Sequence, residues 1–197
     1  TNFASLSEGT FDLNIEDVIS SGITGLGTII AIVDTGLEIT HEDLSANVVA
    51  GKSYDYSDQD NNPEPINSLG DHGTSIAGLT SAVGGPNIGV RGVAPNSKVV
   101  GFNVIGGSNN TTSNMIDALG GASGGAETGE IDIFNMSFGS NMDRFFPSPL
   151  NASFEAAFKN GVDNLRGGKG AIYVTSAGNQ WSFKENSNLY FCGPNYG

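Results

Sequence analysis

Four short apolar runs, rich in β-branched residues, constrain the fold of this 197-residue chain more than any other feature. They span Thr28 to Asp34, Lys98 to Ile105, Ile131 to Phe138 and Gly170 to Ser176. Each run is nearly continuous in its apolar character, which is typical of strands that are buried on both faces of a parallel sheet. The sequence therefore predicts a buried parallel sheet as the centre of the fold.

Stretches with helical periodicity separate these runs. Apolar residues recur at spacings of three and four over His72 to Val83, Thr112 to Ala122 and Leu150 to Leu165. In the first of these stretches, Ile76, Leu79 and Val83 share one face. Strands that alternate with helices favour right-handed βαβ crossovers, so we expect an α/β fold with a doubly wound, mostly parallel sheet.

Polar residues stand at the ends of the predicted strands. Asp34 closes the first run, Ser137 to Gly139 close the third, and Asn179 follows the fourth, while His72 opens a helix. Reactive groups of open α/β sheets lie outside the carboxyl ends of the strands. We therefore expect these residues to face one crevice.

These residue types suit peptide hydrolysis by a serine enzyme. That reaction needs a base for the hydroxyl proton, a group that fixes the base, and a donor for the oxyanion. His72 is the expected base, because His41 lies in a polar surface stretch. Asp34 would hold the imidazole in the right tautomer, and Asn179 would offer its side-chain amide to the oxyanion.

Two motifs allow another interpretation. Asp34-Thr35-Gly36 is also a signature of aspartic proteases, but those enzymes need two such carboxylates and the chain has no second triplet of this kind. Gly73-Thr74-Ser75-Ile76-Ala77 matches Gly-Thr-Ser-x-Ala, a pattern that surrounds the nucleophilic serine in some serine proteases. It follows His72 directly, however, so Ser75 is not the expected nucleophile.

The charge and the cysteine content exclude several classes of function. The chain has 21 acidic and 8 basic residues, a net charge of −13, which argues against nucleic acid as a partner. No apolar run approaches the length of a membrane span, and the polar sequence after Thr1 predicts no signal peptide. Cys192 is the only cysteine and there are two histidines, so neither an intrachain disulfide nor a zinc catalyst is expected.

The order of Asp34, His72 and Asn179 resembles that of subtilisin-like serine proteases. Further segments are similar to the kexin and furin branch of that family: Gly22 to Gly25, Ala31 to Asp34, Thr40 to Leu44, Ser53 to Pro63 and Gly168 to Val174. The similarity extends from about Asp12 to Asn179 and so covers most of the chain.

This resemblance implies that residues 1–197 form part of a subtilisin-like peptidase domain, truncated before the nucleophile segment. The serine is expected beyond Gly197, in the remainder of the same polypeptide. The family implies a polypeptide substrate, a propeptide or chaperone, and a secreted or periplasmic location. Ser137-Phe138-Gly139 matches the family's Ser-Trp-Gly strand, whose backbone pairs with an extended substrate.

The resemblance also implies calcium as a cofactor, since Ca²⁺ prefers carboxylate and carbonyl oxygens. In the Asp-rich loop, the matching ligands are Asp55, Asp60 and Asn62. A second family site combines an acid with backbone oxygens, and its matching residues here are Asp43, Val83, Ile88 and Val90. Pro86 stands where this second site has a ligating asparagine, and Asn87 is one place later.

The substrate preference and two alternative functions have to be considered. Thr35 replaces the second aspartate of kexin and furin, which weakens the expectation of basic substrates. Asp143 and Glu185 lie near the expected first pocket, so a preference for basic residues stays open. The chain could also be an inactive subtilisin-like fragment or a peptide-binding protein with the same fold. An unrelated doubly wound ligand-binding domain would need a phosphate-binding turn after a strand, and the sequence shows none.

Overall fold

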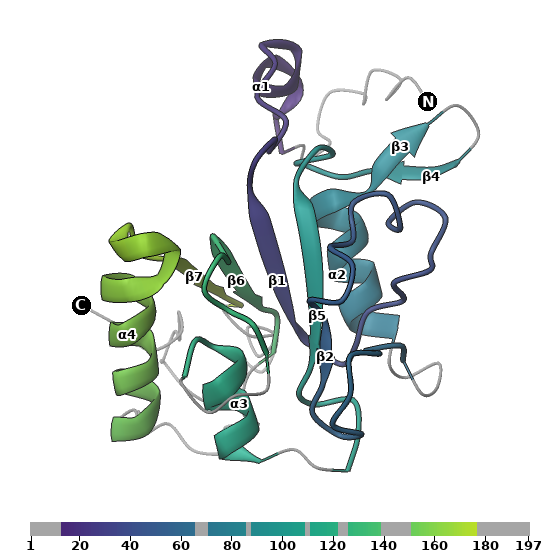
Figure 1. Ribbon diagram of the computed structural model, residues 1–197. Coiled ribbons are helices and arrows are strands. Elements are labelled where there is room, and N and C mark those ends of the chain that lie inside the picture. Colours follow the sequence, from purple (N-terminus) through teal and green to yellow (C-terminus); the bar gives the residue numbers. More distant parts are fainter. Residues whose placement is uncertain are drawn as a thin grey trace, which may run out of the picture.

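The computed structural model describes residues 13–65, 71–85, 88–108, 111–121, 126–138 and 151–176 (Figure 1). Several residues singled out above lie outside these ranges: Pro86, Asn87, Gly139, Asp143, Asn179, Glu185 and Cys192. In the part that is described, no helix has both the length and the apolar character needed to cross a membrane.

The described residues form four helices and seven strands. In chain order they are α1 (Glu16–Ser20), β1 (Ile29–Asp34), β2 (Tyr54–Asp55), α2 (Asp71–Ser81), β3 (Val83–Gly85), β4 (Ile88–Arg91), β5 (Lys98–Asn103), α3 (Thr112–Ala118), β6 (Ile133–Met136), α4 (Ala152–Gly168) and β7 (Ile172–Thr175). The four predicted strands and three predicted helices are all present, with ends that differ by a few residues.

The central sheet is parallel throughout and has the strand order β2-β5-β1-β6-β7. β1 lies in the middle, with β5 on one side and β6 on the other. The chain builds one half of the sheet first and then crosses β1 to build the other half. The predicted doubly wound parallel sheet is therefore confirmed.

Alternate residues of β1 belong to two separate hydrophobic clusters. Ala31 and Val33 pack in the cluster that includes residues of α3 and α4, whereas Ile30 and Ile32 pack in the cluster that includes residues of α2. Figure 1 shows α2 on one side of the sheet and α3 and α4 on the other. Because both faces are covered, β1 is apolar at every position before Asp34.

The helix predicted over His72 to Val83 differs from the observed α2 in its length and in its buried face. α2 ends at Ser81, and Val83 begins the antiparallel hairpin β3–β4, which the sequence did not predict. Leu79 is 64% exposed, although it was expected on the buried face. The buried residues of this helix are small: Gly73, Ala77 and Ser81. They allow α2 to approach the sheet closely.

The other helix ends also differ from the prediction. α3 ends at Ala118, four residues early, and Gly120 follows with a φ of +96°, a conformation that favours glycine. α4 extends to Gly168 but contains a break at Leu165 to Gly167. Arg166, at this break, forms an ion pair with Asp132 before β6. The break therefore fixes the end of α4 against the sheet.

Candidate active site

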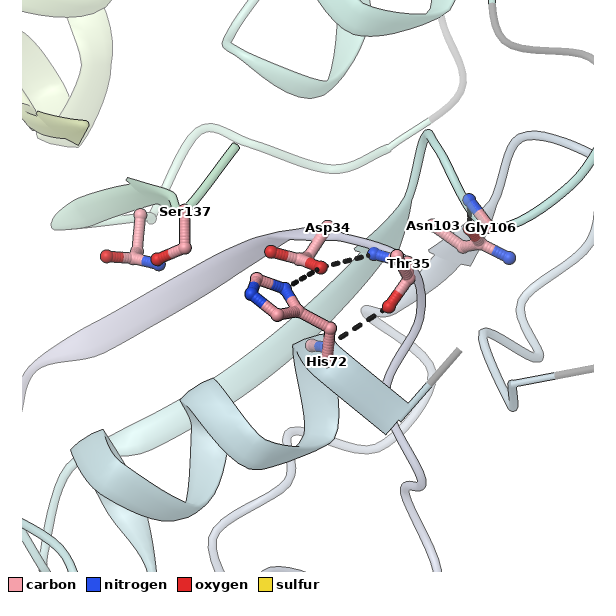
Figure 2. A network of polar contacts seen from close by, with 8 residues as sticks. Asp34, Thr35, His72, Asn103, Gly106 and Ser137 are labelled. Carbon is pink, nitrogen blue, oxygen red and sulfur yellow. Dashed lines mark hydrogen bonds and ion pairs between the residues drawn. The ribbon is translucent and has the colours of Figure 1, made fainter. Parts of the chain in front are cut away.

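Asp34 ends the central strand β1, and its side chain is completely buried. Its Oδ1 atom accepts the backbone N–H of Thr35 at 2.7 Å and lies 2.7 Å from Nδ1 of His72 (Figure 2). The chain turns away directly afterwards, where Gly36 has a φ of +123° that favours glycine. The turn therefore leaves the carboxylate at the carboxyl end of the strand.

His72 is the second residue of α2, and its side chain is half exposed. An ionised carboxylate only accepts hydrogen bonds, so the proton in the contact with Asp34 belongs to Nδ1 of the ring. In the neutral ring this leaves the lone pair on Nε2. A histidine held in this tautomer is suited to take a proton from another group.

Close packing fixes the beginning of α2 against the turn after β1. A Cβ atom on Gly73 would lie 2.1 Å from the carbonyl oxygen of Gly36 and 3.1 Å from Cβ of Asp34. The backbone N–H of Gly73 donates to Oγ1 of Thr35 at 3.1 Å, and the N–H of Glu38 donates to Oγ1 of Thr74 at 2.9 Å. Only glycine permits this approach, which sets the position of His72 relative to Asp34.

The second oxygen of Asp34 has an unusual environment. Among the described residues, Oδ2 of Asp34 is the one buried side-chain nitrogen or oxygen atom with no hydrogen-bond partner. A buried polar atom without a partner costs about 1–3 kcal/mol, so native structures rarely retain one without a functional reason. The unpartnered oxygen thus belongs to the residue that holds His72.

Ser137 and Phe138 follow β6, whose register with β1 pairs Ile32 with Asn135. Oγ of Ser137 accepts a hydrogen bond from Nδ2 of Asn135 at 2.9 Å, and Phe138 is partly buried against the core. Figure 2 shows Ser137 near the Asp34 and His72 side chains. The structure thus brings together Asp34, His72 and Ser137, while Gly139 and Asn179 lie outside the described ranges.

Ser75, the residue rejected as a nucleophile, is exposed on α2. The hydrogen bonds of the described residues include none between Ser75 and His72, whose Nδ1 is engaged by Asp34. This geometry gives Ser75 no activated hydroxyl.

The Asp-rich loop is organised around Asp55, which is 1% exposed. Oδ1 of Asp55 accepts the N–H groups of Ser57 at 2.6 Å and Asp58 at 3.1 Å, and Oδ2 accepts Nδ2 of Asn103 at 2.7 Å. The backbones of Asp55 and Asp60 form a bridge. Amide donors thus engage both carboxylate oxygens of Asp55.

Asp60 and Asn62 occupy the exposed side of the same loop. Oδ1 of Asp60 accepts the backbone N–H of Asn62 at 2.9 Å. The three expected calcium ligands of this loop are therefore neighbours, and the buried member, Asp55, accepts two hydrogen bonds at Oδ1 and one at Oδ2. Calcium binding here stays a prediction.

Asp43, expected at the second calcium site, is buried against the β3–β4 hairpin. Its Oδ1 atom accepts the N–H of Gly84 at 2.9 Å and its Oδ2 atom accepts that of Val90 at 2.8 Å, while the N–H of Val83 donates to its carbonyl at 2.9 Å. A Cβ on Gly89 would lie 2.2 Å from Oδ2 of Asp43. The hairpin backbone thus surrounds this carboxylate closely.

Asp43 is a buried carboxylate whose contacts in the described residues are hydrogen bonds from backbone N–H groups. No lysine or arginine within the described ranges forms an ion pair with it, and buried carboxylates are usually compensated by a cation. The hairpin includes Val83, Val90 and the backbone of Ile88, so the predicted residues do lie together. In this structure, however, amide N–H groups hold the carboxylate, and calcium at Asp43 stays a prediction.

Asn103 is a residue of this region that the sequence interpretation missed. It ends β5, pairs in register with Asp34 on β1, and is completely buried. The sequence did not mark it, because Asn103 lies inside the apolar run of Lys98 to Ile105 and is followed by Val104 and Ile105.

Comparison with known proteins agrees with this geometry. A family model described as the subtilase family matches residues 25–193, most of the chain. Human furin is 35% identical over 172 residues, which cover 85% of this chain and 21% of furin. Human neuroendocrine convertase 2 is 35% identical over 185 residues, which cover 91% of this chain and 28% of the convertase. The chain thus spans about a quarter of these relatives.

Solved structures of proteases have the same fold. The serine protease of Aeromonas sobria, in complex with its chaperone, matches with a TM-score of 0.68 and 32% identity, covering 80% of this chain and 26% of the protease. A cold-adapted subtilisin-like serine proteinase matches with a TM-score of 0.57 and 26% identity, covering 80% of this chain and 49% of the proteinase. The chain therefore belongs to the subtilase family and has a subtilisin-like α/β fold.

Proposed function

We propose that this chain provides the acid–base part of a serine endopeptidase. The observation that carries the proposal is the contact of 2.7 Å between Nδ1 of the half-exposed His72 and Oδ1 of the completely buried Asp34. A buried acid that fixes one ring nitrogen, with the other nitrogen available, is the arrangement that a general base requires. Membership of the subtilase family supports peptide bonds as the target.

In the proposed reaction, Nε2 of His72 takes the proton from a serine hydroxyl supplied by the remainder of the polypeptide. The serine oxygen attacks the peptide carbonyl, and the negative charge of Asp34 stabilises the imidazolium that forms. Asn179 donates its side-chain amide to the oxyanion. The imidazolium then gives its proton to the leaving amine, and water, activated by the same base, hydrolyses the acyl-enzyme.

Substrate binding is assigned to the segment Ser137 to Gly139. Its first residue, Ser137, directly follows β6, and β6 pairs with β1 in a register that aligns Asn135 with Ile32. An extended peptide that pairs with this backbone would add a strand and would present its scissile bond near His72. Gly139 would contribute a position without a side chain, which allows a close approach of the substrate backbone.

Calcium is proposed as a structural cofactor. Asp43, with backbone oxygens of Val83, Ile88 and Val90, would hold one ion, and the loop of Asp55, Asp60 and Asn62 would hold another. A bound cation would neutralise the buried charge of Asp43 and stabilise the hairpin. It has no part in the bond-breaking steps.

A propeptide or chaperone is also proposed as a folding partner. The Aeromonas sobria protease is known in complex with a chaperone, which supports such a partner for this chain. A secreted or periplasmic location fits this set of partners and stays a prediction.

Replacement of the two histidines in turn tests the proposed function. Peptide hydrolysis is measured for the full polypeptide, for His72→Ala and for His41→Ala as the matched control. We expect His72→Ala to lower kcat by about 10⁴-fold or more, because the base is lost, and His41→Ala to stay within about threefold. A folded His72→Ala protein with undiminished peptide hydrolysis would refute the role of His72 as the base.

A further inference from the structure

Three adjacent strands carry buried polar side chains at the same level of the sheet. Asp55 on β2 pairs in register with Asn103 on β5, which pairs in register with Asp34 on β1. Their exposed fractions are 1%, 0% and 0%. Two buried carboxylates are thus separated by one neutral amide.

Both the nitrogen and the oxygen of the Asn103 side-chain amide form hydrogen bonds. Nδ2 donates to Oδ2 of Asp55 at 2.7 Å, and Oδ1 accepts the backbone N–H of Gly106 at 2.8 Å. Asp55 is itself fixed by two backbone N–H groups of its loop. Asn103 therefore ties the Asp-rich loop to the turn of residues 103–106 that follows β5.

This turn holds the backbone of Asp34 directly. The N–H groups of Val104 and Ile105 donate to the carbonyl oxygen of Asp34 at 3.0 and 3.3 Å. A Cβ on Gly106 would lie 2.2 Å from the carbonyl oxygen of Thr35. Figure 2 shows Asn103 and Gly106 beside Thr35, so a movement of the turn would move the acid that holds His72.

We propose that Asn103 is a positioning residue for the Asp34–His72 pair, acting through the turn of residues 103–106. This inference rests on the proposed peptidase function. The side chain of Asn103 forms its hydrogen bonds with Asp55 and Gly106 and not with His72. Its proposed contribution is to hold in place the turn that binds the backbone of Asp34. A neutral side chain is required at this place, because a carboxylate there would face Asp55 and would lack the proton to donate.

Loss of the hydrogen bonds of the Asn103 side chain should lower kcat more than it raises KM. A displacement of about 1 Å in catalytic groups can cost about 10²-fold in rate. For Asn103→Ala we therefore expect kcat to fall by about 10- to 100-fold while KM changes by less than about twofold.

The experiment compares exchanges of the two side chains in the full protease. Asn103→Asp removes the donor, and Asp55→Asn removes the acceptor charge. The double variant Asp55→Asn/Asn103→Asp restores the hydrogen bond in the opposite direction, with Gly106 still able to donate to position 103. We expect kcat of both single variants to fall by about 10- to 100-fold, as for Asn103→Ala. The kcat of the double variant should recover to within about fivefold of the wild-type value.

Asn47→Ala is the matched control for general destabilisation. Asn47 is also buried, and its Nδ2 donates to the backbone carbonyls of Ser81 and Pro95, at the opposite end of α2 from His72. Its loss should lower the melting temperature without a change in kcat beyond about threefold.

A second readout does not depend on peptidase activity. The NMR resonance of the proton on Nδ1 of His72 reports its hydrogen bond to Asp34. It should shift or broaden in Asn103→Ala and in both single exchanges, and return in the double variant, but stay in place in Asn47→Ala. If wild type shows no hydrolysis while the resonance follows this pattern, the positioning role stands and the proposed function fails.

The inference is overturned if the folded single variants keep both the wild-type resonance and kcat. It is also overturned if the folded double variant recovers the melting temperature but neither kcat nor the resonance, because the hydrogen bond would then be structural alone.

Discussion

Nδ1 of His72 lies 2.7 Å from Oδ1 of Asp34, although 38 positions separate the two residues in the chain. One comes from the start of a helix and the other from the end of the central strand. The acid is completely buried and the histidine is half exposed, so the pair connects the core to the surface. The buried charge is fixed in place, while the ring that it holds can meet a substrate.

Asp34→Asn should abolish turnover without unfolding the protein. An asparagine side chain at this position favours the wrong tautomer of His72, so we expect kcat to fall by about 10⁴-fold. The variant also removes a buried charge whose Oδ2 atom has no hydrogen-bond partner, so the melting temperature should change by only a few degrees. Calorimetry and peptide hydrolysis check the two parts. A large loss of stability with little loss of turnover would make Asp34 a structural residue.

Gly73→Ala should be damaging, and Gly78→Ala on the same helix should not be. A Cβ at position 73 would lie 2.1 Å from the carbonyl oxygen of Gly36, whereas one at position 78 has no atom within 4 Å. We expect a loss of about 1–3 kcal/mol in the free energy of unfolding for Gly73→Ala, with reduced kcat because His72 is adjacent. For Gly78→Ala we expect a gain of about 0.5–1 kcal/mol, since alanine favours helix. Chemical unfolding of both variants measures the difference, and equal effects would contradict the described packing.

Calcium removal should lower the melting temperature of the full protease. A ligand that binds only the folded state adds RT ln(1 + [L]/Kd) to its stability, so a chelator should reverse that gain. Asp43→Asn should remove most of the response to the chelator if the hairpin holds the ion, and Asp60→Asn tests the Asp-rich loop in the same way. A wild-type melting curve that is unchanged by the chelator rules out a stabilising calcium ion.

Alkaline pH should weaken the contact between β7 and the end of α3 through Tyr173. Burial raises the pKa of Tyr173 from 10.0 to about 12, and its hydroxyl donates to the carbonyl of Leu119 at 2.7 Å. Because the folded-state pKa is raised, this stability is fully present below pH 10 and is lost as the pH rises through about 12.

Tyr173→Phe provides the control for this effect. It should cost about 1 kcal/mol at pH 7 through the lost hydrogen bond, and the gap to wild type should narrow between pH 10 and 12. Unfolding free energies measured across this range decide the matter. A gap that stays constant would show that Tyr173 does not titrate in the folded protein.

The sheet could be predicted from the sequence because its strands are buried on both faces and are therefore continuously apolar. β2 escaped prediction since Tyr54 and Asp55 are too short a strand to leave a pattern. The β3–β4 hairpin was missed because its glycines and short strands resemble a loop. The buried face of α2 was predicted wrongly because it is made of glycine, alanine and serine, which hydrophobic periodicity does not detect.

The part of the candidate site that could be predicted from the sequence is the part in which a motif residue stands at the end of a predicted strand or at the start of a predicted helix. Asp34 and His72 could be placed together because a strand end and a helix start meet at the same edge of a parallel sheet. The network around Asn103 could not be predicted, since it depends on the registers that align Asp55, Asn103 and Asp34 across three strands. Hydrogen bonds between distant residues become visible only when the strand order is known.

Fluorophosphonate labelling of the full polypeptide, followed by peptide mass mapping, tests most directly whether Asp34 and His72 activate a serine. The account predicts a covalent label on a serine in a segment outside this chain, with labelling abolished in His72→Ala and unaffected in Ser75→Ala. A label on Ser75, or a folded wild-type protein in which no serine reacts, would contradict it.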